Sequence, residues 1–213
     1  MTTTTADSVS GRNAPTPEQT RRGRRTALLL FAVGFGPMVL ATIMFYTGWL
    51  NPAGHSNQGE LVQPVVSVQA LNLNARGGEP LADRFGVDKE APKWLLLVAA
   101  GTCTEDCEQL LYLARQVNIA LGKNASRVSR AAWLGRTPAA LDARWNEEYE
   151  SMERLKRMPG TMPAWPEGIN PDVEPRILLV DPFGNVMMHY GAEHTGKQML
   201  KDLKQLLKLS QIG

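Results

Sequence analysis

The feature that most constrains this chain is a run of 24 residues without a charge, from Ala27 to Leu50. At about 1.5 Å per residue, a helix of that length covers the roughly 30 Å hydrocarbon core of a bilayer. Three aromatic residues gather at the C-terminal end, as in an interfacial belt: Phe45, Tyr46 and Trp49. No convincing small-residue cleavage site precedes Gly48, which argues against a cleaved signal peptide. We therefore expect one uncleaved transmembrane helix over residues 26–50.

Charge is distributed unevenly about this span. Residues 1–25 carry five arginines and two acidic residues, and no further charge appears until Glu60. The positive-inside rule then predicts a cytoplasmic N-terminus and places residues 51–213 across the membrane, in the periplasm if the membrane is a bacterial inner membrane. Since the net charge is only +2 and the part after residue 25 sums to −1, the chain has no electrostatic footprint for nucleic acid.

The composition and the hydrophobic periods predict four segments. Residues 1–25 are expected to be a disordered cytoplasmic tail and 51–59 a linker, while 60–213 form one folded periplasmic domain. Within that domain, strand patterns occupy 61–74, 92–100, 126–134, 177–180 and 186–190, and helical patterns occupy 102–121, 137–156 and 195–209. We interpret the charged stretch NEEYESMERLKR as a solvated helix face. This order predicts an α/β domain with a mixed sheet flanked by helices.

The only two cysteines, Cys103 and Cys107, follow the apolar strand pattern directly in the stretch GTCTEDC. A strand, then cysteines, then a helix is the thioredoxin-like arrangement. It predicts Cys103 on an exposed first turn, where the helix dipole lowers a thiol pKa, and Cys107 one turn further on. Three interpretations remain open: a pair that is redox-active or holds a soft metal ion, a structural disulfide whose short loop adds little stability, and inert thiols.

Three carboxylates flank the cysteines: Glu105, Asp106 and Glu108. Carboxylates this close raise a thiol pKa, which opposes a strongly nucleophilic thiolate. Their other interpretation is as acidic residues of a first helical turn that complement the helix dipole.

Two longer stretches carry a family resemblance. WLLLVAAGTCTEDC, followed later by RILLVDPFGNVMMHY and a terminal amphipathic helix, resembles the Sco/SenC-type proteins, and the resemblance extends over roughly residues 60–210. These are membrane-anchored, thioredoxin-fold factors of cytochrome c oxidase assembly. The resemblance implies that Cys103 and Cys107 correspond to the family's cysteines, which bind copper(I) together with a distant histidine.

The chain departs from the family pattern at the site itself. Thr104 and Glu108 stand where the family has proline after each cysteine, and Val173 stands at the position of the ligand histidine. Pro175 occupies the place where thioredoxin folds often have a cis-proline beside the cysteines. Other possible ligands are weaker, and we interpret them as structural or solvated residues: His55, His189, His194, Met158 and Met162.

The expected function follows from the resemblance. It implies a membrane-anchored accessory protein of cytochrome c oxidase assembly, whose partners are oxidase subunits or other assembly factors. In the expected chemistry Cys103 exchanges with a partner's cysteines and Cys107 resolves the mixed disulfide, or the pair handles copper. The alternative is a non-catalytic scaffold of the same pathway that has lost the copper site.

Overall fold

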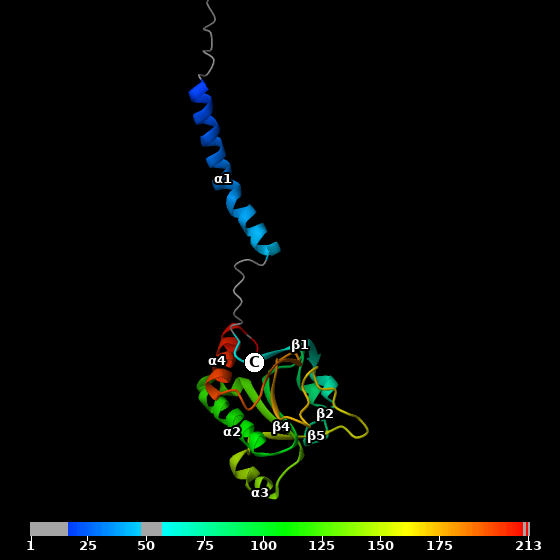
Figure 1. The fold of residues 1–213 in the computed structure, drawn as a ribbon. Helices are drawn as coiled ribbons and strands as arrows, with labels where there is room; N and C mark the ends of the chain where they lie inside the picture. The colour runs from blue at the N-terminus through cyan, green and yellow to red at the C-terminus, as the bar shows by residue number, and fades with distance from the viewer. Residues whose placement is uncertain (1–16, 48–56, 211, 213) are drawn as a thin grey trace, which may run out of the picture. The chain divides into compact units, whose positions relative to one another are not determined.

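In the computed structural model of the chain, residues 17–47, 57–210 and 212 are described, and they fall into two units divided at residue 55. The predicted tail at 1–16 and most of the linker, 51–56, lie outside the described residues. The first unit contains one helix, α1 (Pro17–Thr47). The second unit contains every other element (Figure 1).

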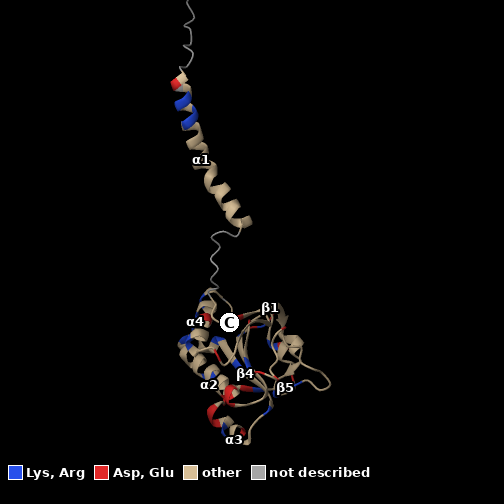
Figure 2. Ribbon diagram, in the orientation of Figure 1, with Lys and Arg blue, Asp and Glu red and all other residues tan. Residues whose placement is uncertain are grey.

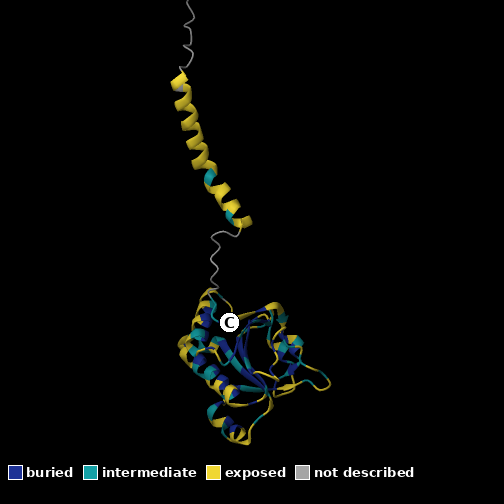
Figure 3. Cartoon of the chain, viewed as in Figure 1, coloured by how far each residue is buried: buried dark blue, intermediate teal, exposed yellow. Residues whose placement is uncertain are grey.

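The helix α1 is long and apolar enough to cross a membrane, since an 18-residue window within Thr20–Thr47 has a mean hydropathy of 2.3. It begins at Pro17, earlier than the predicted start, and residues 48–50 lie outside the described residues. Its side chains are almost all exposed (Figure 3), as a lipid-facing helix requires. Figure 2 shows Lys and Arg only near its N-terminal end. An N-terminal apolar helix of spanning length is thus confirmed.

The second unit follows the predicted order of strands and helices. Its strands (β), α-helices (α) and short 3-10 helices (η) are, in chain order, β1 (Glu60–Ser67), η1 (Val68–Leu71), β2 (Leu73–Asn74), η2 (Leu81–Arg84), β3 (Trp94–Thr102), α2 (Glu105–Ala120), η3 (Gly122–Arg127), β4 (Val128–Arg136), α3 (Ala139–Glu148), β5 (Glu153–Arg157), β6 (Arg176–Val180), β7 (Asn185–Tyr190) and α4 (Gly196–Leu209). The seven strands form one sheet in the order β1-β7-β6-β3-β4-β5-β2. Strands β3, β4 and β5 are parallel, and the other pairs are antiparallel. The mixed sheet of a thioredoxin-like fold is thereby confirmed.

Strand β3 divides the core into two layers. Leu96, Val98 and Ala100 face a cluster built with α2, α3 and α4, whereas Leu95 and Leu97 face a second cluster built with η1, η2 and β2. This alternation explains the unbroken apolar run, because a strand covered on both faces needs apolar residues at every position.

One predicted helix is too long. The pattern over 137–156 gives a helix only to Glu148, after which the chain turns and forms β5. Strand β5 pairs with β4 and with β2, and its middle residue Leu155 is buried. The charge run was therefore interpreted wrongly in part: Arg154 lies over the Trp145 ring, 4.1 Å from its centroid, and covers apolar surface instead of projecting into water.

The region predicted as one or two strands over 61–74 is broken by η1. Ser67 begins this turn by accepting a hydrogen bond from the Gln69 amide, and Asn72 ends it in the left-handed conformation at φ 48°. The DPFGN turn between β6 and β7 also forms, with the Asp181 carboxylate accepting from the amides of Phe183 and Asn185.

The chain enters the folded unit through a buried polar cluster. The Asp202 carboxylate on α4 is 3% exposed and accepts hydrogen bonds from the amides of Gln58 and Gly59 at 2.8 Å and from the Tyr190 hydroxyl at 3.1 Å. A Cβ at Gly59 would lie 2.7 Å from Cζ of Tyr190, so only glycine fits there. This cluster fastens the segment before β1 to the last helix.

Candidate functional site

Cys103 and Cys107 are joined by a disulfide at the point where the central strand β3 passes into α2. Their Cα atoms lie 5.0 Å apart. Cys103 directly follows β3, and its amide donates a hydrogen bond of 2.8 Å to the carbonyl of Arg136 at the end of β4. The pair is therefore held at the carboxyl end of the central parallel strands.

The start of α2 differs from the prediction. Thr104 is the N-cap in extended conformation, with φ −100° and ψ −172°, and the helix begins at Glu105. Cys103 thus precedes the helix instead of lying on its first turn, and Cys107 is the residue on that turn. Because the two sulfurs are bonded to each other, the disulfide as a whole lies at the start of the helix.

Both cysteines are buried, which corrects the expectation of an exposed Cys103. Cys103 is 3% exposed and Cys107 is 0% exposed, and both belong to the core cluster that contains Leu110 and Leu111. The reason is that α2 packs its apolar face on the sheet from its first turn onward. Cys103 is the slightly less buried residue of the pair.

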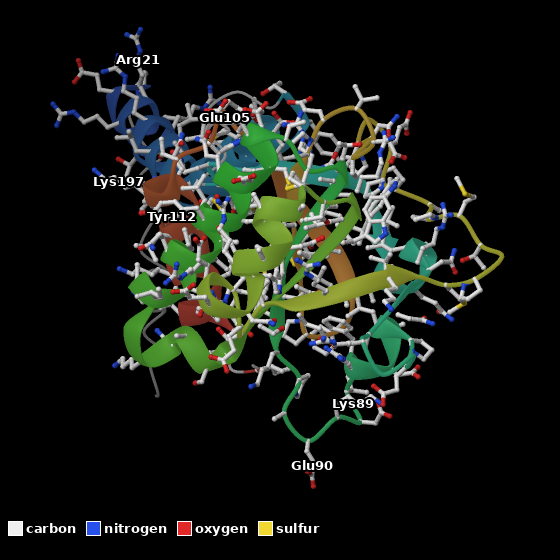
Figure 4. The ribbon with its side chains drawn as sticks, turned by 90° about the horizontal axis from the view of Figure 1, so that it is seen from below. Arg21, Lys89, Glu90, Glu105, Tyr112 and Lys197 are labelled. Carbon is white, nitrogen blue, oxygen red and sulfur yellow. A yellow bond between two sulfur atoms is a disulfide. The ribbon has the colours of Figure 1, made fainter. Side chains whose placement is uncertain are left out.

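The helix start is acidic. Glu105 and Asp106 are exposed, and Figure 4 shows Glu105 at the beginning of α2 with Tyr112 further along the helix. Glu108 pairs with Arg144 of α3. Glu105 and Asp106, which have no ion pair with any described residue, therefore stand on the helix side of the disulfide, and they disfavour a thiolate while the helix dipole favours one.

Pro175 lies just before β6, which is paired with β3. Among the described residues the one cis peptide bond joins Gln63 to Pro64, so the bond before Pro175, whose isomer the sequence leaves open, is trans. The preceding residues form a turn in which the amides of Val173 and Glu174 both donate to the carbonyl of Asn170 at 3.0 Å. This turn brings the chain into β6 with a trans bond.

The remaining ligand candidates do not complete a copper site. Val173, at the histidine position, is 81% exposed. His194 accepts a hydrogen bond from the Gly191 amide, and His189 contacts Glu60. Met162 is 70% exposed in a loop, and His55 lies outside the described residues.

Within the part of the chain that the structure describes, no group of three His, Cys, Asp or Glu residues is placed to hold a metal ion. The two sulfurs of the pair are bonded to each other. In this oxidised form the residues present do not fit copper(I), which needs free thiolates. Copper binding by a reduced pair stays a prediction.

A cleft of about 450 Å³ was missed by sequence reasoning; it is lined by Arg136, whose carbonyl accepts the hydrogen bond from the Cys103 amide. It opens at the carboxyl ends of β3, β4 and β5, and the polar residues and glycines that line it are Gly101, Gly135, Arg136, Lys156, Arg157 and Asp172. The only sequence signal for this cleft is that β4 and β5 both end in positively charged residues. This signal could not be used, because β5 was predicted as part of a helix.

Two family models match the chain. The one described as "Transmembrane-like, thioredoxin-like, C-terminal domain" matches residues 94–210, and the one described as "Transmembrane-like, N-terminal domain" matches residues 17–48. No curated protein matches the chain.

Similar solved structures include Sco proteins and other thioredoxin-like proteins. Apo Sco1 from Thermus thermophilus is 17% identical with a TM-score of 0.47, over 72% of this chain and 99% of that chain. Copper-bound yeast Sco1 is 13% identical with a TM-score of 0.46, over 72% of this chain and 90% of that chain. A thio-disulfide isomerase from Thermus thermophilus is 16% identical with a TM-score of 0.39, over 72% of this chain and 98% of that chain.

The first family model covers more than half of the chain, from β3 to the end of α4, and includes the disulfide. The second covers α1. The chain therefore belongs to the family of transmembrane-like proteins with a thioredoxin-like C-terminal domain.

Proposed function

We propose that this chain is a membrane-anchored, thioredoxin-fold accessory protein of cytochrome c oxidase assembly that acts by thiol–disulfide exchange at Cys103 and Cys107. The observation that supports the chemistry is the disulfide between β3 and the first turn of α2. The choice of the oxidase as the target rests on the Sco-type sequence pattern.

The exchange begins at Cys103, because its sulfur belongs to the less buried residue of the pair. A partner thiolate attacks this sulfur, the Cys103–Cys107 bond breaks, and Cys107 leaves as a thiolate at the helix start. A second partner thiolate then displaces the Cys103 thiolate from the mixed disulfide. The partner gains a disulfide and the chain gains two electrons. Run backwards, the same steps reduce a partner's disulfide, with Cys103 attacking and Cys107 resolving.

The proposed location is a bacterial inner membrane, crossed once by α1, with the N-terminus cytoplasmic and residues 51–213 periplasmic. The cluster of arginines at the N-terminal end of α1 supports this orientation (Figure 2). A periplasmic domain suits a disulfide, since that compartment is oxidising. Protease added to spheroplasts should digest the C-terminal domain, and full protection of that domain would contradict the orientation.

A second candidate function is a scaffold that holds an assembly intermediate through surface contacts. The burial of both sulfurs and the valine at position 173 favour it. In this case the disulfide fastens β3 to α2 and undergoes no exchange with a partner.

Substitution of the cysteines distinguishes the two functions. Cells carrying Cys103→Ala should contain less assembled oxidase, measured by haem absorbance in membranes, while an exposed α2 substitution such as Tyr112→Ser leaves it unchanged. The amount of the variant protein must equal wild type by immunoblot. Normal oxidase in both Cys103→Ala and the double Cys103→Ala/Cys107→Ala variant would exclude exchange and support the scaffold.

Copper is tested separately on the reduced full-length protein in detergent. If the pair handles copper, reduced wild type should bind one equivalent of copper(I) that the Cys103→Ala/Cys107→Ala variant does not bind. Equal uptake by both proteins would show that the pair is not the ligand.

A further inference from the structure

Two glycines line the cleft and allow chain segments to approach closely there. A Cβ at Gly101 would lie 2.7 Å from the Asp172 Cα, and a Cβ at Gly135 would contact the Gly101 carbonyl oxygen. The turn before β6 therefore packs directly on the end of β3. The Gly101 amide donates to the carbonyl of Pro171 at 2.8 Å, which fixes this wall.

The cleft is connected directly to Cys103. Arg136, which lines the cleft, accepts a hydrogen bond from the Cys103 amide through its carbonyl, 2.8 Å away. Its side chain donates from Nε to the hydroxyl of Thr102 at 3.1 Å. The cleft is thus linked, through this backbone contact, to one of the two residues that form the disulfide.

The charge in the cleft is mainly positive. Arg136, Lys156 and Arg157 are all exposed, and within the described residues none of them has an acidic partner within salt-bridge distance. Asp172 is the one acidic residue that lines the cleft. Three positive residues and one negative residue thus line the cleft, in a chain whose part after residue 25 is nearly neutral.

The opposite side of the disulfide has the opposite charge. Glu105 and Asp106 project from the first turn of α2 and have no ion pair among the described residues. A partner that approaches Cys103 therefore meets positive potential on the strand side and negative potential on the helix side. Such an arrangement selects one orientation of a charged partner and raises its rate of encounter.

We propose that the cleft formed by Arg136, Lys156 and Arg157 binds an acidic segment of the protein whose cysteine exchanges with Cys103. This inference rests on the proposed exchange function. The occupant is a peptide with Asp or Glu within a few residues of its cysteine, because an extended residue spans only about 3.3 Å and the cleft adjoins Cys103. Carboxylates fit the two guanidinium groups, which bind them bidentately.

The test uses full-length protein in detergent micelles and two synthetic dithiol peptides. One carries two Asp and two Glu residues around its cysteines, and the other carries Asn and Gln instead. At low salt the acidic peptide should be oxidised by the Cys103–Cys107 disulfide roughly tenfold faster, and the ratio should fall towards one at about 1 M salt, where the Debye length is about 3 Å.

Two cleft variants and one control locate the effect. Arg136→Gln/Lys156→Gln/Arg157→Gln should abolish the preference for the acidic peptide, and Lys156→Gln/Arg157→Gln, which leaves the Cys103 contacts intact, should remove most of it. Lys201→Gln/Lys204→Gln/Lys208→Gln removes the same charge from the exposed face of α4 and should keep the preference. Dithiothreitol should react equally with wild type and the α4 variant, and the ratio of the acidic-peptide rate to the dithiothreitol rate should fall in both cleft variants.

The outcomes separate the cleft from the exchange chemistry. Equal rates for the two peptides with wild-type protein would overturn the cleft proposal and leave the exchange function standing. Absence of exchange with both peptides would overturn the proposed function, and anisotropy of a labelled cysteine-free acidic peptide then tests the cleft alone. Binding that the triple cleft variant retains would contradict the proposal, as would displacement of the peptide by millimolar inorganic phosphate, which would indicate a simple anion site.

Discussion

The buried carboxylate of Asp202 gives the sharpest stability prediction. Replacing it by alanine removes the acceptor for the Gln58 and Gly59 amides and for the Tyr190 hydroxyl. The Gly59 and Tyr190 donors are buried, whereas Gln58 is only partly buried and can turn to water. The Tyr190 hydroxyl keeps only the weaker thioether acceptor of Met188, 3.1 Å away. A buried donor left without a good acceptor costs about 1–3 kcal/mol, and the two donors together predict a loss of about 4 kcal/mol.

This loss is large beside the total stability of a domain, which is about 5–15 kcal/mol. At roughly 2–4 °C per kcal/mol for a domain of this size, Asp202→Ala should lower Tm by roughly 8–16 °C. The assay is thermal unfolding of the full-length protein in detergent, followed by near-ultraviolet circular dichroism. Asp83→Ala, an exposed aspartate without a side-chain partner among the described hydrogen bonds, serves as the matched control.

A double-mutant cycle tests the reasoning itself. In the Asp202→Ala background, Tyr190→Phe removes a donor that has already lost its carboxylate acceptor. Tyr190→Phe should therefore lower the free energy of unfolding less than it does in wild type, by about 1 kcal/mol or more. Additive effects of the two substitutions would refute the hydrogen-bond account, and so would a Tm for Asp202→Ala within about 2 °C of the control.

Three further predictions concern other parts of the folded unit. Gly101→Ala should lower stability by about 1–3 kcal/mol in a denaturant titration, because its Cβ would overlap Asp172; an unchanged midpoint would show that the turn moves away freely. Burial lowers the pKa of His189 from its ordinary value of 6.5 despite the nearby Glu60, so the stability linked to it is complete above pH 6.5 and is lost as pH falls. The drop in Tm between pH 7.5 and 5.5 should therefore be smaller in His189→Gln than in wild type, and equal drops would contradict the linkage. Arg84→Ala, which breaks the partly exposed pair with Glu153, should cost only about 0–1 kcal/mol by the same titration.

The fold was largely predictable because its strongest signals are long. The apolar run of β3 is buried on both faces, and the periods of α2 and α4 persist over several turns, so each pattern has one consistent interpretation. Helix α4 begins with a capping box formed by Thr195 and Gln198, which supports the helix start at the residue where the amphipathic pattern begins.

Strand β5 was not predictable for a physical reason. Of its five residues only Leu155 is fully buried, and the long side chains of Glu153 and Arg154 supply apolar stems that a pattern of residue types counts as charged. The strand forms because β4 and β2 offer it hydrogen bonds on both sides, which is information from distant parts of the chain.

The candidate site was predictable in position and wrong in detail. A strand followed by cysteines and a helix placed the pair correctly, but the helix starts at Glu105, and that shift moves Cys103 off the helix and into the core. The positive residues of the cleft lie at the end of β4 (Arg136) and at the end of β5 (Lys156 and Arg157). Their proximity could not be predicted, because β5 was predicted as part of a helix.

The contact of Asp202 with the segment before β1 also has a mechanical consequence. Tension transmitted along the backbone from residues before Gln58 reaches the Asp202 carboxylate before it reaches the β1–β7 ladder. A pulling force on this segment would therefore act first on α4, which is packed in the core, and only afterwards on the hydrogen bonds of the edge strand β1.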